Sequence, residues 1–87
     1  MNSHTTQAFW KHFDALPENV RDQARKAFRL WKEDTSHPSL HFKRIHAREQ
    51  VHAVRVSGGY RALGLREGNT VTWFWIGSHD AYERLIK

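Results

Sequence analysis

The chain has 87 residues, 39% of them hydrophobic and 26% charged, so it can form one domain with one small core. It has no apolar run long enough to cross a membrane, and its first residues, MNSHTTQAFWKH, lack the basic and apolar segments of a secretory signal. The absence of cysteine excludes a disulfide framework, a thiolate nucleophile and a cysteine-based zinc site. We therefore expect a single domain over residues 1–87, suited to the cytoplasm and too small for a separate cofactor domain.

The first half of the chain has helical periodicity. Phe9, Phe13 and Leu16 form one apolar stripe, and Thr5 or Thr6 can cap the start of this helix. Pro17 ends it and suits the first turn of a second helix, in which Val20, Ala24, Ala27 and Trp31 share a face. The pattern predicts a helical hairpin whose aromatic side belongs to the core.

The second half has the composition and alternation of strands. The turn segment DTSHPS (34–39) ends the helices, and four strands are expected at Leu40–Ile45, Val51–Val56, Tyr60–Leu65 and Thr70–Ile76. Glycine should supply positive φ in the Ser57-Gly58-Gly59 turn. The run TVTWFWI is apolar on both faces and is expected to be a central strand, and Ser78 can cap a short helix through Leu85.

These elements predict an α+β fold. A helical hairpin packs on a four-stranded, mainly antiparallel sheet, and a short C-terminal helix follows. The segment MNSHTTQ is too short and polar to predict a further strand.

Positive charge is concentrated in the middle of the chain. The net charge is +5, and residues 35–66 carry six basic residues against one Glu: Lys43, Arg44, Arg48, Arg55, Arg61 and Arg66. A clustered charge and a pI of about 10.1 favour a polyanionic partner such as nucleic acid. The simpler alternative is a solvated basic face.

The Ser-Gly-Gly turn should place Arg55 and Arg61 at the same end of neighbouring strands. With Lys43 and Arg44 on the preceding strand, two guanidiniums there would form a concave phosphate-binding site. The structural alternative is that these arginines pair with Glu49 or Asp80.

The run RVSGGYRALG followed by TVTWFWIGSHDAYERLI resembles the C-terminal half of the RelE/ParE toxin superfamily. Members carry an arginine-containing strand, a glycine-rich turn, a Tyr-Arg pair and a strand ending near Gly-x-His or Gly-x-Arg. The segment LPENVRDQARKAFRLWKEDTSHPSLHFKRI resembles the family's helical hairpin and first basic strand, so the likeness covers roughly residues 8–86.

The resemblance implies the toxin of a toxin–antitoxin pair, with a cognate antitoxin that shields the basic groove. Many relatives cut mRNA on the ribosome, while the ParE branch inhibits DNA gyrase. Arg61 matches the arginine that stabilises the scissile phosphate, and His79 lies where nuclease members carry a group near the leaving oxygen. Lys43, Arg44 and Arg55 match basic residues of the groove, Tyr82 lies near a C-terminal family tyrosine, and Arg48 joins the expected nucleic-acid-binding set.

RNA can be cut without a metal or other cofactor if a base activates the 2′-hydroxyl and an acid protonates the departing 5′-oxygen. Arg55 and Arg61 would stabilise the phosphorane, and His79 is the expected acid, although it could instead serve only as a helix residue. Lys43 and His52 are the candidate bases. A zinc site at His37 and His41 is disfavoured because Pro38 breaks the helical spacing.

Three functions follow as hypotheses. The first is a ribosome-dependent mRNA endoribonuclease. The second is a gyrase-binding toxin without nuclease activity. The third is a non-toxic relative that only binds a partner or nucleic acid. It is based on the segment VHAVRV, which lacks the lysines that serve as base in some members, and on the short N-terminal segment, where the family usually has a strand.

Overall fold

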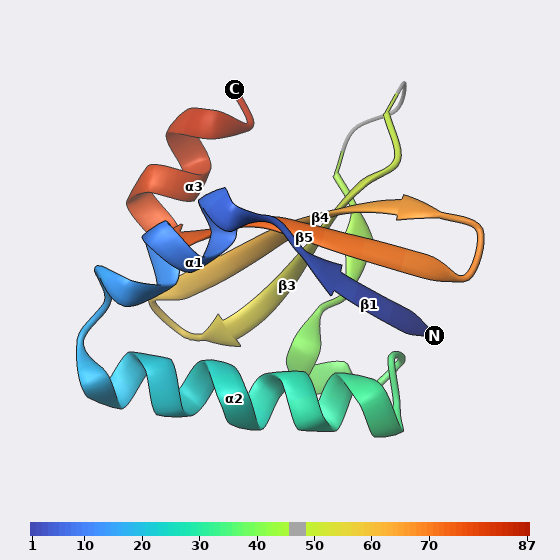
Figure 1. Ribbon diagram of the computed structural model, residues 1–87, viewed down its shortest axis with the longest axis horizontal. Helices are drawn as coiled ribbons and strands as arrows, with labels where there is room; N and C mark the ends of the chain where they lie inside the picture. The colour runs from blue at the N-terminus through green and yellow to red at the C-terminus, as the bar shows by residue number, and fades with distance from the viewer. Residues whose placement is uncertain (46–48) are drawn as a thin grey trace.

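The chain folds into a sheet with helices on both of its faces (Figure 1). The computed structural model describes residues 1–45 and 49–87. Within them the elements are β1 (Asn2–Thr5), α1 (Gln7–Asp14), α2 (Glu18–Glu33), a 3-10 helix (Pro38–Leu40), β2 (Lys43–Arg44), β3 (Val51–Ser57), β4 (Tyr60–Glu67), β5 (Thr70–Ser78) and α3 (His79–Leu85). No helix in these two ranges has the length and hydrophobicity of a membrane span.

The helical hairpin forms as the sequence predicts. Thr6 caps α1, with its hydroxyl oxygen accepting a hydrogen bond from the Phe9 N–H at 3.1 Å. Pro17 is the N-cap residue of α2, whose long apolar stripe buries Val20 and Trp31. The two helices therefore present one aromatic side to the sheet.

The sheet has the order β1-β5-β4-β3-β2, one strand more than the four predicted. The four expected strands are antiparallel neighbours, and β5 is an inner strand, as its doubly apolar pattern indicates. The additional strand, β1, pairs with β5 in parallel. Its polar residues form a strand because the ladder needs only backbone groups, and the Trp73 indole N–H donates to the Ser3 hydroxyl at 3.1 Å.

The face of the sheet under the hairpin holds the larger core. Trp31 of α2 is 1% exposed and packs edge-on against Trp73 of β5, with ring centroids 5.4 Å apart. Phe13 of α1 joins the same cluster. In Figure 1, α2 runs along this face and α3 lies on the other side of the sheet.

The opposite face carries a smaller cluster under α3. Its buried members are Ala53, Leu63 and Tyr82. Trp75 also packs on this face, although strict alternation would place it with Trp73. A register shift between Leu63 and Gly64 opposite β5 accounts for the change, because Trp73 pairs with Gly64 and Trp75 with Leu63.

The first predicted strand is much shorter than expected. Leu40 ends a 3-10 helix, and His41 has a left-handed backbone, so only Lys43 and Arg44 form β2. The predicted alternation still holds beyond this point. Phe42 packs against Trp31, with ring centroids 5.7 Å apart, and Lys43 lies on the other face.

The prediction of positive φ in the Ser57-Gly58-Gly59 turn was wrong. Gly68, in the β4–β5 turn, is the only glycine of the described chain with positive φ, at 60°. The β3–β4 turn instead contains a shift in pairing between Arg55 and Ser57, which provides the reversal without a left-handed glycine.

Candidate nucleic-acid interface

Two arginines face each other where β3 and β4 meet. Arg55 and Arg61 are directly paired in the antiparallel register, so their side chains leave the same face of the sheet. This is the face opposite the helical hairpin, because Arg55 alternates in phase with Ala53. Like charges directly opposite each other destabilise a sheet, so this pairing needs a compensating contact or an anion.

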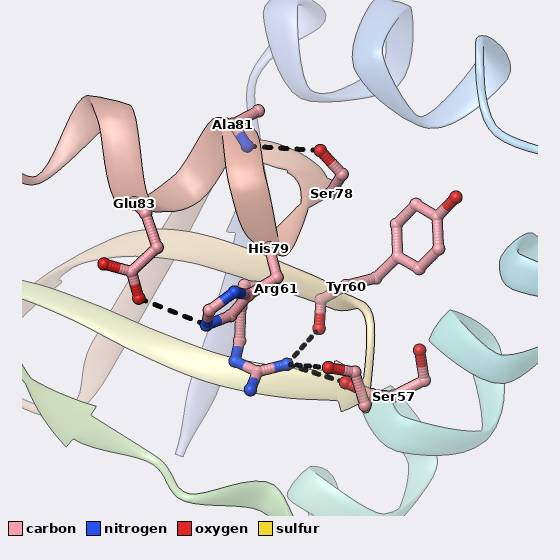
Figure 2. Close-up of polar contacts among 8 residues, drawn as sticks. Ser57, Tyr60, Arg61, Ser78, His79, Ala81 and Glu83 are labelled. Atoms are coloured by element: carbon pink, nitrogen blue, oxygen red, sulfur yellow. Dashed lines mark hydrogen bonds and ion pairs between the residues drawn. The ribbon is translucent and has the colours of Figure 1, made fainter.

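The Arg61 guanidinium is held by the turn next to it. Its Nη1 donates to the carbonyl oxygens of Ser57 at 2.7 Å and Tyr60 at 2.9 Å, and more weakly to Gly58 at 3.4 Å (Figure 2). These contacts use one nitrogen of the guanidinium. In residues 1–45 and 49–87, the other N–H groups have no hydrogen-bond partner, so they remain available to an anion.

Arg55 reaches the same turn. A Cβ placed on Gly58 would lie 3.6 Å from Nη2 of Arg55, so this guanidinium also lies beside the turn. The predicted alternative was pairing with Glu49 or Asp80. Over the part of the chain that the structure describes, neither Arg55 nor Arg61 forms an ion pair, and the ion pairs present are Arg25–Asp22 and His79–Glu83.

The start of α3 lies beside the arginine pair. The His79 backbone N–H donates to the Gly59 carbonyl at 2.8 Å, which links α3 to the β3–β4 turn. Ser78 caps the helix as predicted, accepting from the Ala81 N–H at 3.2 Å. The His79 ring is therefore fixed near Arg61, and its Nε2 lies 3.1 Å from a carboxylate oxygen of Glu83 (Figure 2).

Tyr82 lies one turn further along α3 and is 6% exposed. Its ring centroid is 5.9 Å from that of His79. Burial raises the pKa of the Tyr82 phenol above its usual value, the carboxylate of Glu83 raises it further, and Arg61 partly opposes both. The phenol is therefore neutral at physiological pH and can donate a hydrogen bond.

These side chains line one hollow of about 220 Å³, here called the cationic hollow. β2, β3 and β4 provide its floor and α3 its wall. Its charged, polar and aromatic members are His41, Lys43, Arg55, Arg61, His79, Tyr82 and Glu83. All five residues predicted to be catalytic, namely Arg61, His79, Arg55, Lys43 and Tyr82, thus lie around the same space.

Two other residues singled out from the sequence, Arg44 and His52, are not among the described residues that line it. Arg44 is paired with His52 across β2 and β3, so both side chains are on the helical face. His52 is 8% exposed, with its ring 5.1 Å from that of Phe42. Arg48 lies outside the described residues. Among the predicted bases, only Lys43 is therefore in the hollow.

The sequence interpretation missed His41 as a member of the hollow. The predicted strand Leu40–Ile45 places His41 on the same face as Lys43, but its only assigned role is in the disfavoured zinc site. The signal available in the sequence was the turn residue Pro38 shortly before it, which favours a break in the strand near this point.

A second, larger hollow of about 610 Å³ lies on the helical face, between α1, α2 and β1. Its lining is mostly aromatic and aliphatic and includes Phe9, Trp10, Phe28 and Trp31. Trp10 and Phe28 are 47% and 45% exposed. Its lining also includes His4, Arg25 and Arg29, and the Arg25 guanidinium is paired with Asp22 and lies 5.2 Å from the centroid of the Phe13 ring.

Both the sequence and the fold resemble those of known proteins. Residues 18–84 match the model of a family described as the ParE-like toxin domain. No curated protein matches the chain.

Several solved structures share the fold. RelE in the RelB–RelE antitoxin–toxin complex of Methanococcus jannaschii is a representative, with a TM-score of 0.76 at 15% identity, covering 97% of this chain and 99% of that one. The RelBE2 toxin–antitoxin complex of Mycobacterium tuberculosis has a TM-score of 0.71 at 16% identity, and the match covers 90% of this chain and 96% of that one. The YoeB/ParE toxin of Agrobacterium tumefaciens has a TM-score of 0.69 at 10% identity, and the match covers 91% of this chain and 99% of that one.

Proposed function

The chain belongs to the ParE-like toxin domain family and is a toxin of the RelE/ParE type, and from this premise we propose that it cuts messenger RNA on the ribosome. The single observation that carries the proposal is the pair of arginines at the β3–β4 turn. They face each other with no carboxylate partner in the described residues, beside an imidazole, in an open hollow. A phosphodiester would supply the missing negative charge.

The reaction assigned to the hollow is phosphoryl transfer within the RNA. The 2′-oxygen attacks the adjacent phosphorus while the bond to the 5′-oxygen breaks, giving a 2′,3′-cyclic phosphate and a free 5′-hydroxyl. The phosphorane carries more negative charge than the substrate, and fixed donors stabilise it preferentially. Arg61 and Arg55 have this role, and the turn carbonyls that hold Arg61 keep it in place before substrate binds.

His79 is proposed to donate the proton to the departing 5′-oxygen. Its contact with Glu83 is an ion pair when the imidazole is protonated, so the carboxylate also orients the ring. The neutral Tyr82 phenol lies beside it and can donate to a phosphate oxygen. Lys43, exposed on the β2 side of the hollow, adds positive charge.

The test is cleavage of mRNA by purified protein on programmed ribosomes, read as new transcript ends. Arg61→Ala should lower the cleavage rate by about 10²–10³-fold, the effect of removing one transition-state donor. The control is Arg66→Ala, in the same strand but away from the hollow, where the guanidinium donates to the Gly68 carbonyl. It should leave the rate unchanged. A folded Arg61→Ala protein that cleaves as well as the wild type would contradict the proposal.

A second candidate is supported by the name of the matching family, which is ParE-like. In this case the basic hollow docks on DNA gyrase and no RNA is cut. Induction would then cause DNA damage signalling and filamentous growth while transcripts stay intact. Harmless expression would instead favour a relative that has lost toxicity.

Either toxin function implies an antitoxin. The similar structures from Methanococcus jannaschii and Mycobacterium tuberculosis are antitoxin–toxin complexes. We expect a cognate antitoxin whose acidic segment covers the cationic hollow, because its unpaired guanidiniums favour carboxylates as well as phosphate. Co-expression with the neighbouring reading frame should abolish growth arrest and protect Arg55 and Arg61 from guanidine-modifying reagents.

A further inference from the structure

The backbone at His41 differs from that of every other non-glycine residue the structure describes. It has φ 45° and ψ 41°, and it is the only non-glycine residue in residues 1–45 and 49–87 with positive φ. An L side chain adopts this conformation at an energetic cost, and such strained residues cluster at functional sites. His41 therefore needs an explanation beyond the chain reversal, which Gly or Asn would make at lower cost.

The conformation is fixed from both sides. Before His41, Leu40 is 2% exposed and anchors the 3-10 helix in the core. After it, Phe42 packs against Trp31. With both neighbours held on the helical face, the left-handed turn leaves the exposed His41 side chain among the residues that line the cationic hollow.

The topology places two histidines on different sides of the arginine pair. His41 precedes β2, the edge strand next to β3, whereas His79 follows β5, the strand next to β4. Arg55 and Arg61 lie on the two strands between them. In the strand order, a phosphodiester bound by the arginines would therefore lie between the two histidines.

The two imidazoles also differ in their partners. His79 is bound to the Glu83 carboxylate, which suits a proton donor. Within the two described ranges, the exposed His41 ring has no hydrogen-bond or ion-pair partner, so its nitrogens are free to accept a proton. Histidine is the side chain most often used for general acid–base catalysis, so we assign electrostatic stabilisation to the neighbouring Lys43.

We propose that His41 is the proton acceptor of the cleavage reaction. The proposal rests on the proposed function and completes it. The neutral His41 ring takes the proton from the 2′-hydroxyl as the 2′-oxygen forms its bond to phosphorus. The bond from phosphorus to the 5′-oxygen breaks, and this oxygen takes a proton from His79. One proton enters the enzyme and one leaves it, so no metal or oxidant is required.

The experiment compares His41→Asn with the wild type in the ribosome-dependent cleavage assay across pH. Asn tolerates the left-handed backbone, so the fold should persist, as thermal unfolding would verify. The control is His37→Asn, four positions earlier in the same turn, which keeps a side-chain acceptor for the Ser39 N–H. A general base contributes about 10²–10⁴-fold, so His41→Asn should lose at least 100-fold in single-turnover rate with ribosome binding unchanged.

The pH profile separates catalysis from a structural role. Among the described residues, the charged and titratable groups that line the hollow with His41 are Lys43, Arg55, Arg61, His79, Tyr82 and Glu83, and all of them persist in the variant. The wild-type rate should fall at low pH as the acceptor becomes protonated, and this fall should disappear in His41→Asn. In His41→Gly, added imidazole should restore cleavage.

The outcomes are distinguishable. Wild-type protein that leaves mRNA intact at every pH overturns the proposed function together with the role of His41. Wild-type cleavage with unimpaired His41→Asn overturns the role of His41 alone. A slow His41→Asn enzyme that keeps the low-pH fall, and a His41→Gly enzyme that imidazole does not rescue, would also overturn it, because the acceptor would then be another group.

Discussion

The two faces of the sheet use the same strands for different purposes. On the helical face, Trp31 and Trp73 are almost completely buried and belong to the larger core cluster. On the face under α3, Arg55 and Arg61 are half-buried, directly opposite each other, and lack a carboxylate in the described residues. One face stabilises the fold through buried apolar side chains, while the other keeps two facing cations whose repulsion a bound anion would relieve. The contrast indicates that stability and function can be altered separately.

The largest effect should come from removing the central side chain of the helical face. Trp31→Ala deletes a side chain that is 1% exposed and contacts Trp73 and Phe42, so we expect a loss of about 3–5 kcal/mol in the free energy of unfolding. The matched control is Phe28→Ala, because Phe28 is 45% exposed in the same helix. Urea denaturation measures both. A similar, small loss for the two variants would show that this face is not the main core.

Gly64→Ala should be the next most damaging change. A Cβ at this position would lie 2.5 Å from Cγ1 of Val71 and 2.8 Å from Cε3 of Trp73, both buried. Overpacking of this kind costs about 1–3 kcal/mol. Gly59→Ala is the control, since its Cβ meets no atom within 4 Å and its φ is not positive. Equal thermal stability of the two alanine variants would contradict the close packing inferred for β4 on β5.

A substitution in the cationic hollow should lower activity without lowering stability, the opposite of a substitution in the core. Arg55→Gln removes one of two facing cations, so the cleavage rate should fall by about 10–100-fold, consistent with the loss of roughly 1.5–3 kcal/mol from one charged hydrogen bond. The unfolding free energy should stay equal or rise slightly, because the repulsion with Arg61 is removed. Arg25→Gln, on α2 and paired with Asp22, is the control. Loss of stability without loss of activity would reverse the roles assigned to the two faces.

The smallest effect concerns Tyr82 at alkaline pH. Its pKa is higher in the folded state than in the unfolded chain, chiefly through burial. The unfolded state therefore loses its proton first, so stability is constant below the ordinary pKa of about 10 and decreases as pH rises through the folded value. Tyr82→Phe should remove this decrease. Denaturation curves between about pH 8 and pH 11 provide the measurement.

Much of the fold could be predicted because its signals are local. The helical stripes, the cap at Thr6 or Ser78 and the Ser-Gly-Gly turn each depend on residues a few positions apart. The same turn predicted that Arg55 and Arg61 would meet, and the structure brings them together. Residues that are close in sequence and joined by a tight turn leave few alternatives for their relative placement.

The remaining features depend on distant contacts or on small backbone irregularities. β1 is polar and becomes a strand only because β5, far away in sequence, provides its ladder. The register shift beside Gly64 moves Trp75 to the face opposite Trp73, which alternation does not reveal. Similarly, the left-handed turn at His41 shortens β2 and brings a histidine into the hollow, whereas Arg44 lies on the helical face.

The most direct test of the central claim is to locate a bound RNA on the protein. A short RNA with a 2′-deoxy substitution at the cleavage site, which cannot react, can be titrated while protein NMR signals are followed. We predict that the Arg55 and Arg61 guanidinium signals and the His41 and His79 ring signals shift together, while those of the Trp31 cluster remain unchanged. Shifts confined to the hollow of the helical face, or none in the two guanidiniums, would contradict the account.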